Sequence, residues 1–115
     1  MPRYLISFDE GAMSFPEEEW SDVSDAAHVV VQEAMDAGVW VFGGGLYPRE
    51  EQSVVATDGT VTDGLYPESK AYIGGFSVVE VPSREEALEW ATKIAVACRC
   101  AQDVREFLPD PAVGN

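Results

Sequence analysis

His28 is the only histidine in this chain of 115 residues, and it is the first candidate for chemistry. Imidazole exchanges a proton near neutral pH more readily than other side chains. Helical spacing places His28 at the edge of an apolar stripe containing Val31 and Met35, on the side shared with Ser24 and Gln32. From there it can act as a general acid or base in a cleft at a sheet edge. The alternative is a histidine bonded to a nearby carbonyl or carboxylate.

The segment Thr62–Lys70, TDGLYPESK, is the second candidate, because neither helical nor strand periodicity explains it. Asp63 precedes Gly64, so its carboxylate either aims into a site or caps its own turn. Glu68 and Lys70 can bind a polar group of a ligand, although two such charges in a loop commonly form an exposed ion pair instead. Two interpretations therefore stay open for this segment, a connecting loop and a site.

The remaining chemical groups predict neither a metal nor a cofactor. Cys98 and Cys100 are the only cysteines, and with one histidine the chain lacks a Cys/His set for zinc, so we expect free thiols. The run Gly43–Gly45 lacks the spacing and the following helix of a dinucleotide fingerprint, and no phosphate-binding lysine motif follows it. These glycines indicate crowded backbone beside a second subunit or a pocket.

The charge of the chain narrows its partners. It carries 21 acidic and 7 basic residues, a net charge of −14, which repels nucleic-acid backbones and anionic lipid. The acidity indicates either a cationic partner or a well-solvated surface. We find no apolar stretch of membrane-spanning length and no signal peptide, so we expect a cytoplasmic protein that binds neither nucleic acid nor membrane. The length suits a single domain over residues 1–108 with a C-terminal tail at 109–115.

Periodicity and turn residues predict the order strand, helix, strand, hairpin, strand, helix, strand. Each helix is predicted to begin at a capping box, at Ser14 and at Ser83, and the first ends at Gly38. Asp58-Gly59 is the strongest hairpin signal. The second strand is expected to end in a crowded bend at the three glycines. The predicted strands cover residues 3–8, 39–42, 53–57, 60–62, 76–81 and 101–108.

This order predicts an α+β fold on the ferredoxin-like βαββαβ plan, with a hairpin insertion and both helices on one face of an antiparallel sheet. The other face is bare in a single chain. The run Val39–Phe42 is apolar at adjacent positions, which favours cover on both sides of the sheet. We therefore expect a homodimer that forms through the open sheet face.

The segment 63–70, followed by Gly74-Gly75-Phe76, resembles the DGPF branch of the YCII-related family. The family pattern is Asp-Gly-Pro-aromatic, with a glutamate and a lysine soon after. Leu65 stands where the proline would be, which loosens the turn. The stretch from His28 through DAGVWVFGGGL, the EVPS strand end and the helix with Trp90 extend the resemblance over nearly the whole chain. The matching residues of the motif are Asp63, Gly64, Tyr66, Glu68 and Lys70.

The resemblance implies a dimeric α+β barrel and a His and Asp pair at a pocket, as proposed for some small YCII-like enzymes. The hypothesis is a small organic ligand, neutral or cationic, held in a cleft near His28 and the 63–70 loop, with proton transfer by His28. Asp63 would orient His28 or the ligand. The alternative is a non-enzymatic interaction or regulatory module, because DGPF members are often encoded near extracytoplasmic-function sigma factors. The expected ligand-binding residues are Tyr66, Glu68 and Lys70.

Overall fold

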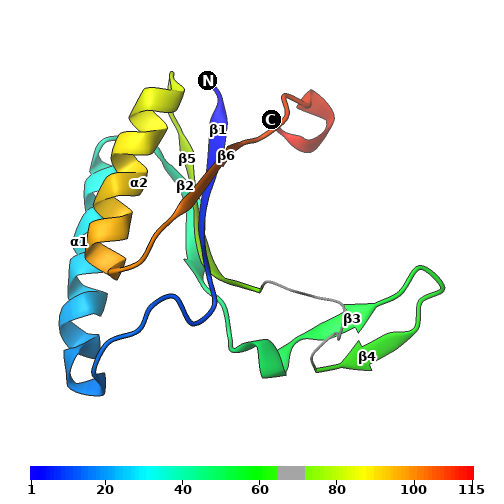
Figure 1. Cartoon of the computed structure of the whole chain (residues 1–115). Coiled ribbons are helices and arrows are strands. Elements are labelled where there is room, and N and C mark those ends of the chain that lie inside the picture. The colour runs from blue at the N-terminus through cyan, green and yellow to red at the C-terminus, as the bar shows by residue number, and fades with distance from the viewer. Residues whose placement is uncertain (65–71) are drawn as a thin grey trace.

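The computed structural model describes residues 1–64 and 72–115, and it has the predicted ferredoxin-like α+β fold (Figure 1). Its main sheet is antiparallel, and its strands lie in the order β2-β5-β1-β6. The helices α1 and α2 lie side by side on one face of this sheet (Figure 1). The elements are β1 (Arg3–Asp9), α1 (Trp20–Asp36), β2 (Trp40–Gly45), β5 (Ile73–Glu80), α2 (Arg84–Cys98) and β6 (Asp103–Glu106).

The predicted hairpin forms a separate two-stranded sheet of β3 (Ser53–Val55) and β4 (Val61–Asp63). It projects from one end of the main sheet, on the side that carries no helix (Figure 1). Its turn has the expected chemistry, because Gly59 takes a positive φ of 88° and the Asp58 carboxylate accepts a hydrogen bond from the Thr60 amide at 2.9 Å. Short 3-10 turns are η1 (Glu17–Glu19), η2 (Arg49–Glu51) and η3 (Pro111–Val113).

The core lies between the main sheet and the helices. Tyr4 and Ile6 alternate with Leu5 along β1, and both are buried on the helix side together with Val79 of β5. From α2, the core receives Ala87 and Ala91, whose small side chains let the helix lie close to the strands. None of the helices in the described ranges combines the length and the hydrophobicity that crossing a bilayer would need.

The predicted start of the first helix is wrong by several residues. Ser14 makes no capping bond, and the backbone stays extended at Pro16, with φ −58° and ψ 143°. A proline disfavours the α conformation at the residue before it, so the helix cannot begin at Phe15. Instead η1 precedes α1, and the Phe15 ring packs edge-on against Trp20 with centroids 4.9 Å apart. The second capping box is confirmed, because Ser83 Oγ accepts from the Glu86 amide at 3.2 Å.

The three glycines lie inside β2 and form no bend, which corrects the predicted end of that strand. The irregularity comes earlier, as a register shift between Trp40 and Phe42. The predicted crowding is present at one position, since a Cβ on Gly43 would overlap the Phe76 carbonyl oxygen. A Cβ on Gly44 or Gly45 would meet nothing within 4 Å, so these two residues border open space.

Candidate functional site

A cavity of about 440 Å³ lies between α1, the β2 edge of the main sheet and the C-terminal half of α2. Its walls are mostly apolar, and they include Trp40, Val31 and Ile94. On the sheet side, the backbones of Gly44 and Gly45 border the cavity, and at Gly45 another residue would place a side chain toward α1. Part of the cavity exists because β2 has no side chain at Gly45 to fill the space that faces α1.

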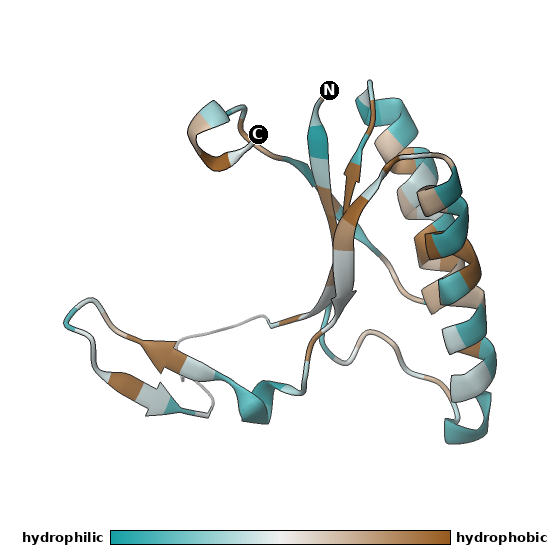
Figure 2. Cartoon of the chain, turned by 180° about the vertical axis from the view of Figure 1, so that it is seen from behind, coloured by the Kyte–Doolittle hydropathy of each residue, from teal (hydrophilic) through white to brown (hydrophobic). Residues whose placement is uncertain are grey.

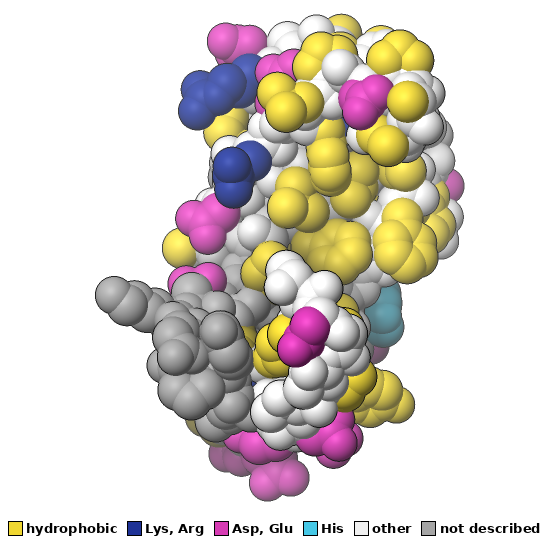
Figure 3. Space-filling view, turned by 90° about the vertical axis from the view of Figure 1, so that its right-hand side faces the viewer, with side chains coloured by type: hydrophobic (Ala, Val, Ile, Leu, Met, Phe, Trp, Pro, Cys, Tyr) yellow, Lys and Arg dark blue, Asp and Glu magenta, His cyan; other side chains and the backbone are white. Residues whose placement is uncertain are grey.

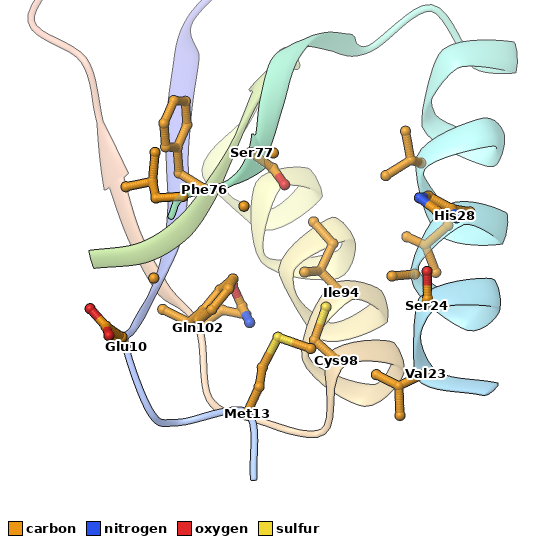
Figure 4. Close-up of a pocket in the computed structure, with 18 of the residues that line it drawn as sticks. Glu10, Met13, Val23, Ser24, His28, Phe76, Ser77, Ile94, Cys98 and Gln102 are labelled. Carbon is orange, nitrogen blue, oxygen red and sulfur yellow. The ribbon is translucent and has the colours of Figure 1, made fainter. Parts of the chain in front are cut away.

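Few polar side chains line this cavity, and His28 is one of them. His28 and Ser24 are one helical turn apart on α1, and Ser77 points from β5 toward that helix (Figure 4). Gln102, just before β6, and Glu10, just after β1, lie at the other side (Figure 4). The arrangement is an apolar space with hydrogen-bonding groups on opposing walls, which suits a small organic molecule with polar substituents.

His28 is exposed, and within residues 1–64 and 72–115 it makes no hydrogen bond or ion pair. The predicted alternative, a histidine satisfied by a neighbouring carbonyl or carboxylate, is therefore not seen among these residues. Both nitrogens of the imidazole remain available to a molecule that enters the cavity.

Glu10 connects the cavity to the base of the hairpin. Its two carboxylate oxygens accept hydrogen bonds from the Arg49 amide at 3.1 and 3.0 Å, and the Arg49 guanidinium lies 3.4 Å away. The same guanidinium stacks over the Tyr72 ring, 4.6 Å from its centroid. These contacts fix the side chain of Glu10 at the edge of the cavity.

Asp63 is not among the residues that line the cavity. It lies at the end of β4, where its carboxylate accepts a hydrogen bond from the Ser53 hydroxyl at 2.6 Å across the hairpin. Within one chain, the structure thus does not bring Asp63 and His28 together at this site. Tyr66, Glu68 and Lys70, the predicted ligand-binding residues, lie outside the described residues.

Cys98 also lines the cavity, and its thiol is free, as is that of Cys100. Burial raises the pKa of the Cys98 thiol above its ordinary 9.0, and the neighbouring Cys100 adds to the effect. A thiol held protonated is a poor nucleophile and a poor metal ligand. Among residues 1–64 and 72–115, no group of three His, Cys, Asp or Glu side chains is arranged to hold a metal ion.

Sequence reasoning missed three polar residues of the cavity, Ser77, Glu10 and Gln102. A signal existed for Ser77, because it alternates with Val79 and so occupies an inward position of β5 that an apolar residue normally fills. No periodicity marks Glu10 or Gln102, since both lie outside regular elements.

The comparisons with known proteins agree with this fold. A structure of the 5-chloro-2-hydroxyhydroquinone dehydrochlorinase TftG from Burkholderia phenoliruptrix AC1100, in complex with 2,5-dihydroxybenzoquinone, is similar with a TM-score of 0.53 and 15% identity over 97% of this chain and 98% of that one. No curated protein matches the sequence. The family model of the YCII-related domain matches residues 4–106. The chain therefore belongs to the YCII-related family.

Proposed function

We propose that this protein binds a small oxygenated organic ring in the cavity between α1 and β2. The observation that carries the proposal is the cavity itself, whose 440 Å³ falls in the size range of small-molecule sites and whose apolar walls hold a few polar groups. A flat ring can lie against the backbone of Gly44 and Gly45. Its substituents then reach His28 and Ser24 on one wall and Ser77 on the other.

The choice of ligand class follows from the similar structure, which contains 2,5-dihydroxybenzoquinone. A hydroxylated six-membered ring is small enough for the cavity and has polar substituents on opposite edges. The likeness in fold does not by itself transfer an activity, so this compound is used as a probe. The proposed ligand near His28 is thus a hydroxylated aromatic or quinonoid ring, and for an acidic hydroxyquinone this replaces the neutral or cationic charge expected from the sequence.

His28 is the group we assign to proton transfer if the bound ring is converted. It is the only histidine of the chain, it lines the cavity, and its nitrogens make no bond within the described residues. Ser24 and Ser77 are suited to orient the substituents of the ring. Asp63 stays a predicted positioning residue, for which the cavity of a single chain offers no support. The predicted roles of Tyr66, Glu68 and Lys70 likewise stay predictions.

The proposal is tested by thermal unfolding with 2,5-dihydroxybenzoquinone, since a ligand of the native state raises its apparent stability by mass action. We expect the probe to raise the melting temperature of the wild type and to raise that of His28→Ala less. Gln32→Ala is the matched control, because Gln32 lies one turn away on α1, is exposed and does not line the cavity.

Gly45→Val supplies a steric test of the same cavity. Gly45 shares the helix-side face with Ser77, and a Cβ there meets nothing within 4 Å, so valine fills the cavity without disturbing the strand. Gly44→Val is its control, since the side chain at this position points to the other face. Loss of probe binding in Gly45→Val but not in Gly44→Val supports the site. Equal binding by all four variants would contradict it.

A second proposal concerns the open sheet face, which we expect to form a homodimer. Leu5, Phe42 and Val78 lie on this face, and 65% of Phe42 is exposed. Hydrophobic side chains gather over the sheet on this side of the molecule (Figure 3). This surface also favours the alternative role, an interaction or regulatory module. Sedimentation of the wild type and of Phe42→Asp measures the dimer, which the charged variant should weaken. A wild type that sediments as a monomer at all accessible concentrations would exclude the homodimer.

A further inference from the structure

The hairpin of β3 and β4, residues 53–63, forms an arm that extends away from the rest of the chain. The radius of gyration is 15.7 Å, whereas a compact domain of this length has about 13 Å. The arm points away from the main sheet at an angle, on the side opposite to the helices (Figures 1 and 2).

The base of the arm is held in a defined direction. Arg49 is bound by Glu10 and by the Tyr72 ring just before the arm begins. At the other end, the Gly64 amide donates to the Gln52 carbonyl at 2.7 Å, which closes the two strands together. The arm therefore projects because its root is fixed, and its direction is a property of the fold.

Within the described residues, the pairing inside the arm is short. Each of its strands has three residues, and an isolated two-stranded hairpin is marginal in water. Val55 and Val61 form a cross-strand pair on one face, and 67% and 60% of these side chains are exposed. Both strands of the arm carry such apolar segments (Figure 2). An exposed apolar pair at the end of a fixed projection is placed where a second surface can cover it.

We infer that in the homodimer each arm lies against the open sheet face of the second copy, so that the two chains clasp each other. This inference rests on the homodimer proposed above. A twofold axis makes the contact reciprocal, since the arm of one copy meets the face of the other twice. The partner's face offers Leu5, Phe42 and Val78 to the exposed valines of the arm.

The area of the sheet face supports this arrangement. Strands about 4.8 Å apart and ~20 Å long give a four-stranded face of about 400 Å². A standard stable interface buries about 800 Å² on each partner. Two flat faces alone thus fall short by about half, and a reciprocal arm contact supplies further buried surface on each chain.

The open face offers the acidic arm one basic side chain, Arg105, beside Asp103 on the same face, which matters in a chain of net charge −14. The arm carries Asp58 at its turn and Asp63 at its base. On the open face, Arg105 lies opposite Leu5, is exposed, and has no ion pair within the described residues. Basic and acidic side chains both occur along one border of this face (Figure 3). Contact between the arm and Arg105 offsets part of the repulsion between two acidic chains.

The test is deletion of the arm. Because Gln52 and Gly64 are hydrogen-bonded neighbours, residues 53–63 can be replaced by a Gly-Ser link without separating the strands of the main sheet. Sedimentation equilibrium of the wild type and the deletion variant gives the dimer dissociation constant of each, and circular dichroism checks that both are folded. We expect at least a hundredfold weaker dimer for the deletion variant.

A double substitution in the full-length chain tests the same contact without the risk that the deletion variant fails to fold. Val55→Thr combined with Val61→Thr keeps β-branched shapes on the arm and removes its apolar face, so we expect a dimer at least tenfold weaker. Val54→Thr, on the opposite face of β3, is the matched control and should leave the dimer unchanged. A wild-type dimer that persists with the same constant in both variants overturns the arm contact and leaves the homodimer intact. A monomeric wild type overturns both.

Discussion

The two helices cover the same sheet face in different ways. The helix α2 begins at a true side-chain cap, Ser83, and buries Ala87, Ala91 and Ile94 against the strands. The helix α1 begins without a side-chain cap and buries only Val23 and Ala34. The difference shows that α2 builds the core, whereas α1 serves mainly as the wall of a cavity.

The physical cause lies in the residues that face each helix. Tyr4 and Val79 fill the space beneath α2, and the small alanines of that helix let it come close. Across from α1, the strand β2 offers Gly45 on its helix side, which has no side chain to meet the helix. The space that a side chain on β2 would fill stays open, and the polar side chains of α1 line it.

Overpacking gives the largest expected difference between the helices. Ala87→Leu inserts three heavy atoms where no space exists, so we expect a loss of about 1–3 kcal/mol in the free energy of unfolding. Ala27→Leu on α1 points its extra atoms into the cavity, so we expect less than about 1 kcal/mol, together with loss of probe binding. Urea denaturation measures both. Equal losses in the two variants would show that α1 packs as tightly as α2.

The helix starts provide a smaller contrast. Ser83→Ala removes the bond to the Glu86 amide and should cost about 1 kcal/mol of stability. Ser14→Ala removes a hydroxyl that caps nothing, so no measurable change is expected in the same denaturation experiment. A loss on Ser14→Ala comparable to that of Ser83→Ala would restore the capping box that the sequence suggested.

The smallest expected effect appears at alkaline pH, on the cavity side of α2. Burial raises the pKa of the Cys98 thiol above 9.0, so the folded protein holds this proton more tightly than the unfolded chain does. The stabilisation that this raised pKa provides is complete below pH 9, and it is lost as the pH rises toward the pKa of the Cys98 thiol in the folded protein. Burial also raises the pKa of Tyr4 above 10.0, with Glu106 adding to it, and extends the loss to higher pH.

This prediction is measured by thermal unfolding between pH 7 and pH 11. Cys98→Ala should reduce the decline that begins near pH 9, to which burial of the Cys100 thiol also contributes, and leave the decline above pH 10, which Tyr4→Phe should reduce instead. An identical profile for the wild type and Cys98→Ala would mean that the thiol is as accessible in the folded protein as in the unfolded chain.

Most of the fold could be predicted, because its signals are local. The Asp58-Gly59 turn, the cap at Ser83 and the alternation in β5 each depend on neighbouring residues, and each is present in the structure. The start of α1 was predicted wrongly because Pro16 restricts Phe15, a local rule that competes with the capping pattern. The glycines of β2 were placed in a bend because their pairing with β5 is not a local property.

The candidate site could also be predicted only where local sequence patterns mark its residues. The helical position of His28 follows from its spacing, and the structure places it on the cavity wall. Three other parts of the chain place polar side chains beside it, namely Ser77, Glu10 and Gln102. No local sequence pattern predicts that these residues come together. Asp63 stands apart on the hairpin, since the direction of an insertion depends on the contacts at its root.

Local sequence patterns suffice to predict the order of the elements, the apolar faces that must be covered and the membership in the YCII-related family, because periodicity, caps and motifs act over a few residues. The cavity between α1 and the glycines of β2, and the arm that points away from its own body, are visible only in the folded chain. Both features depend on strand register and on side chains that are missing where two elements face each other. Register and packing are set by residues far apart in the chain, so neither feature exists before the helices and strands have packed together.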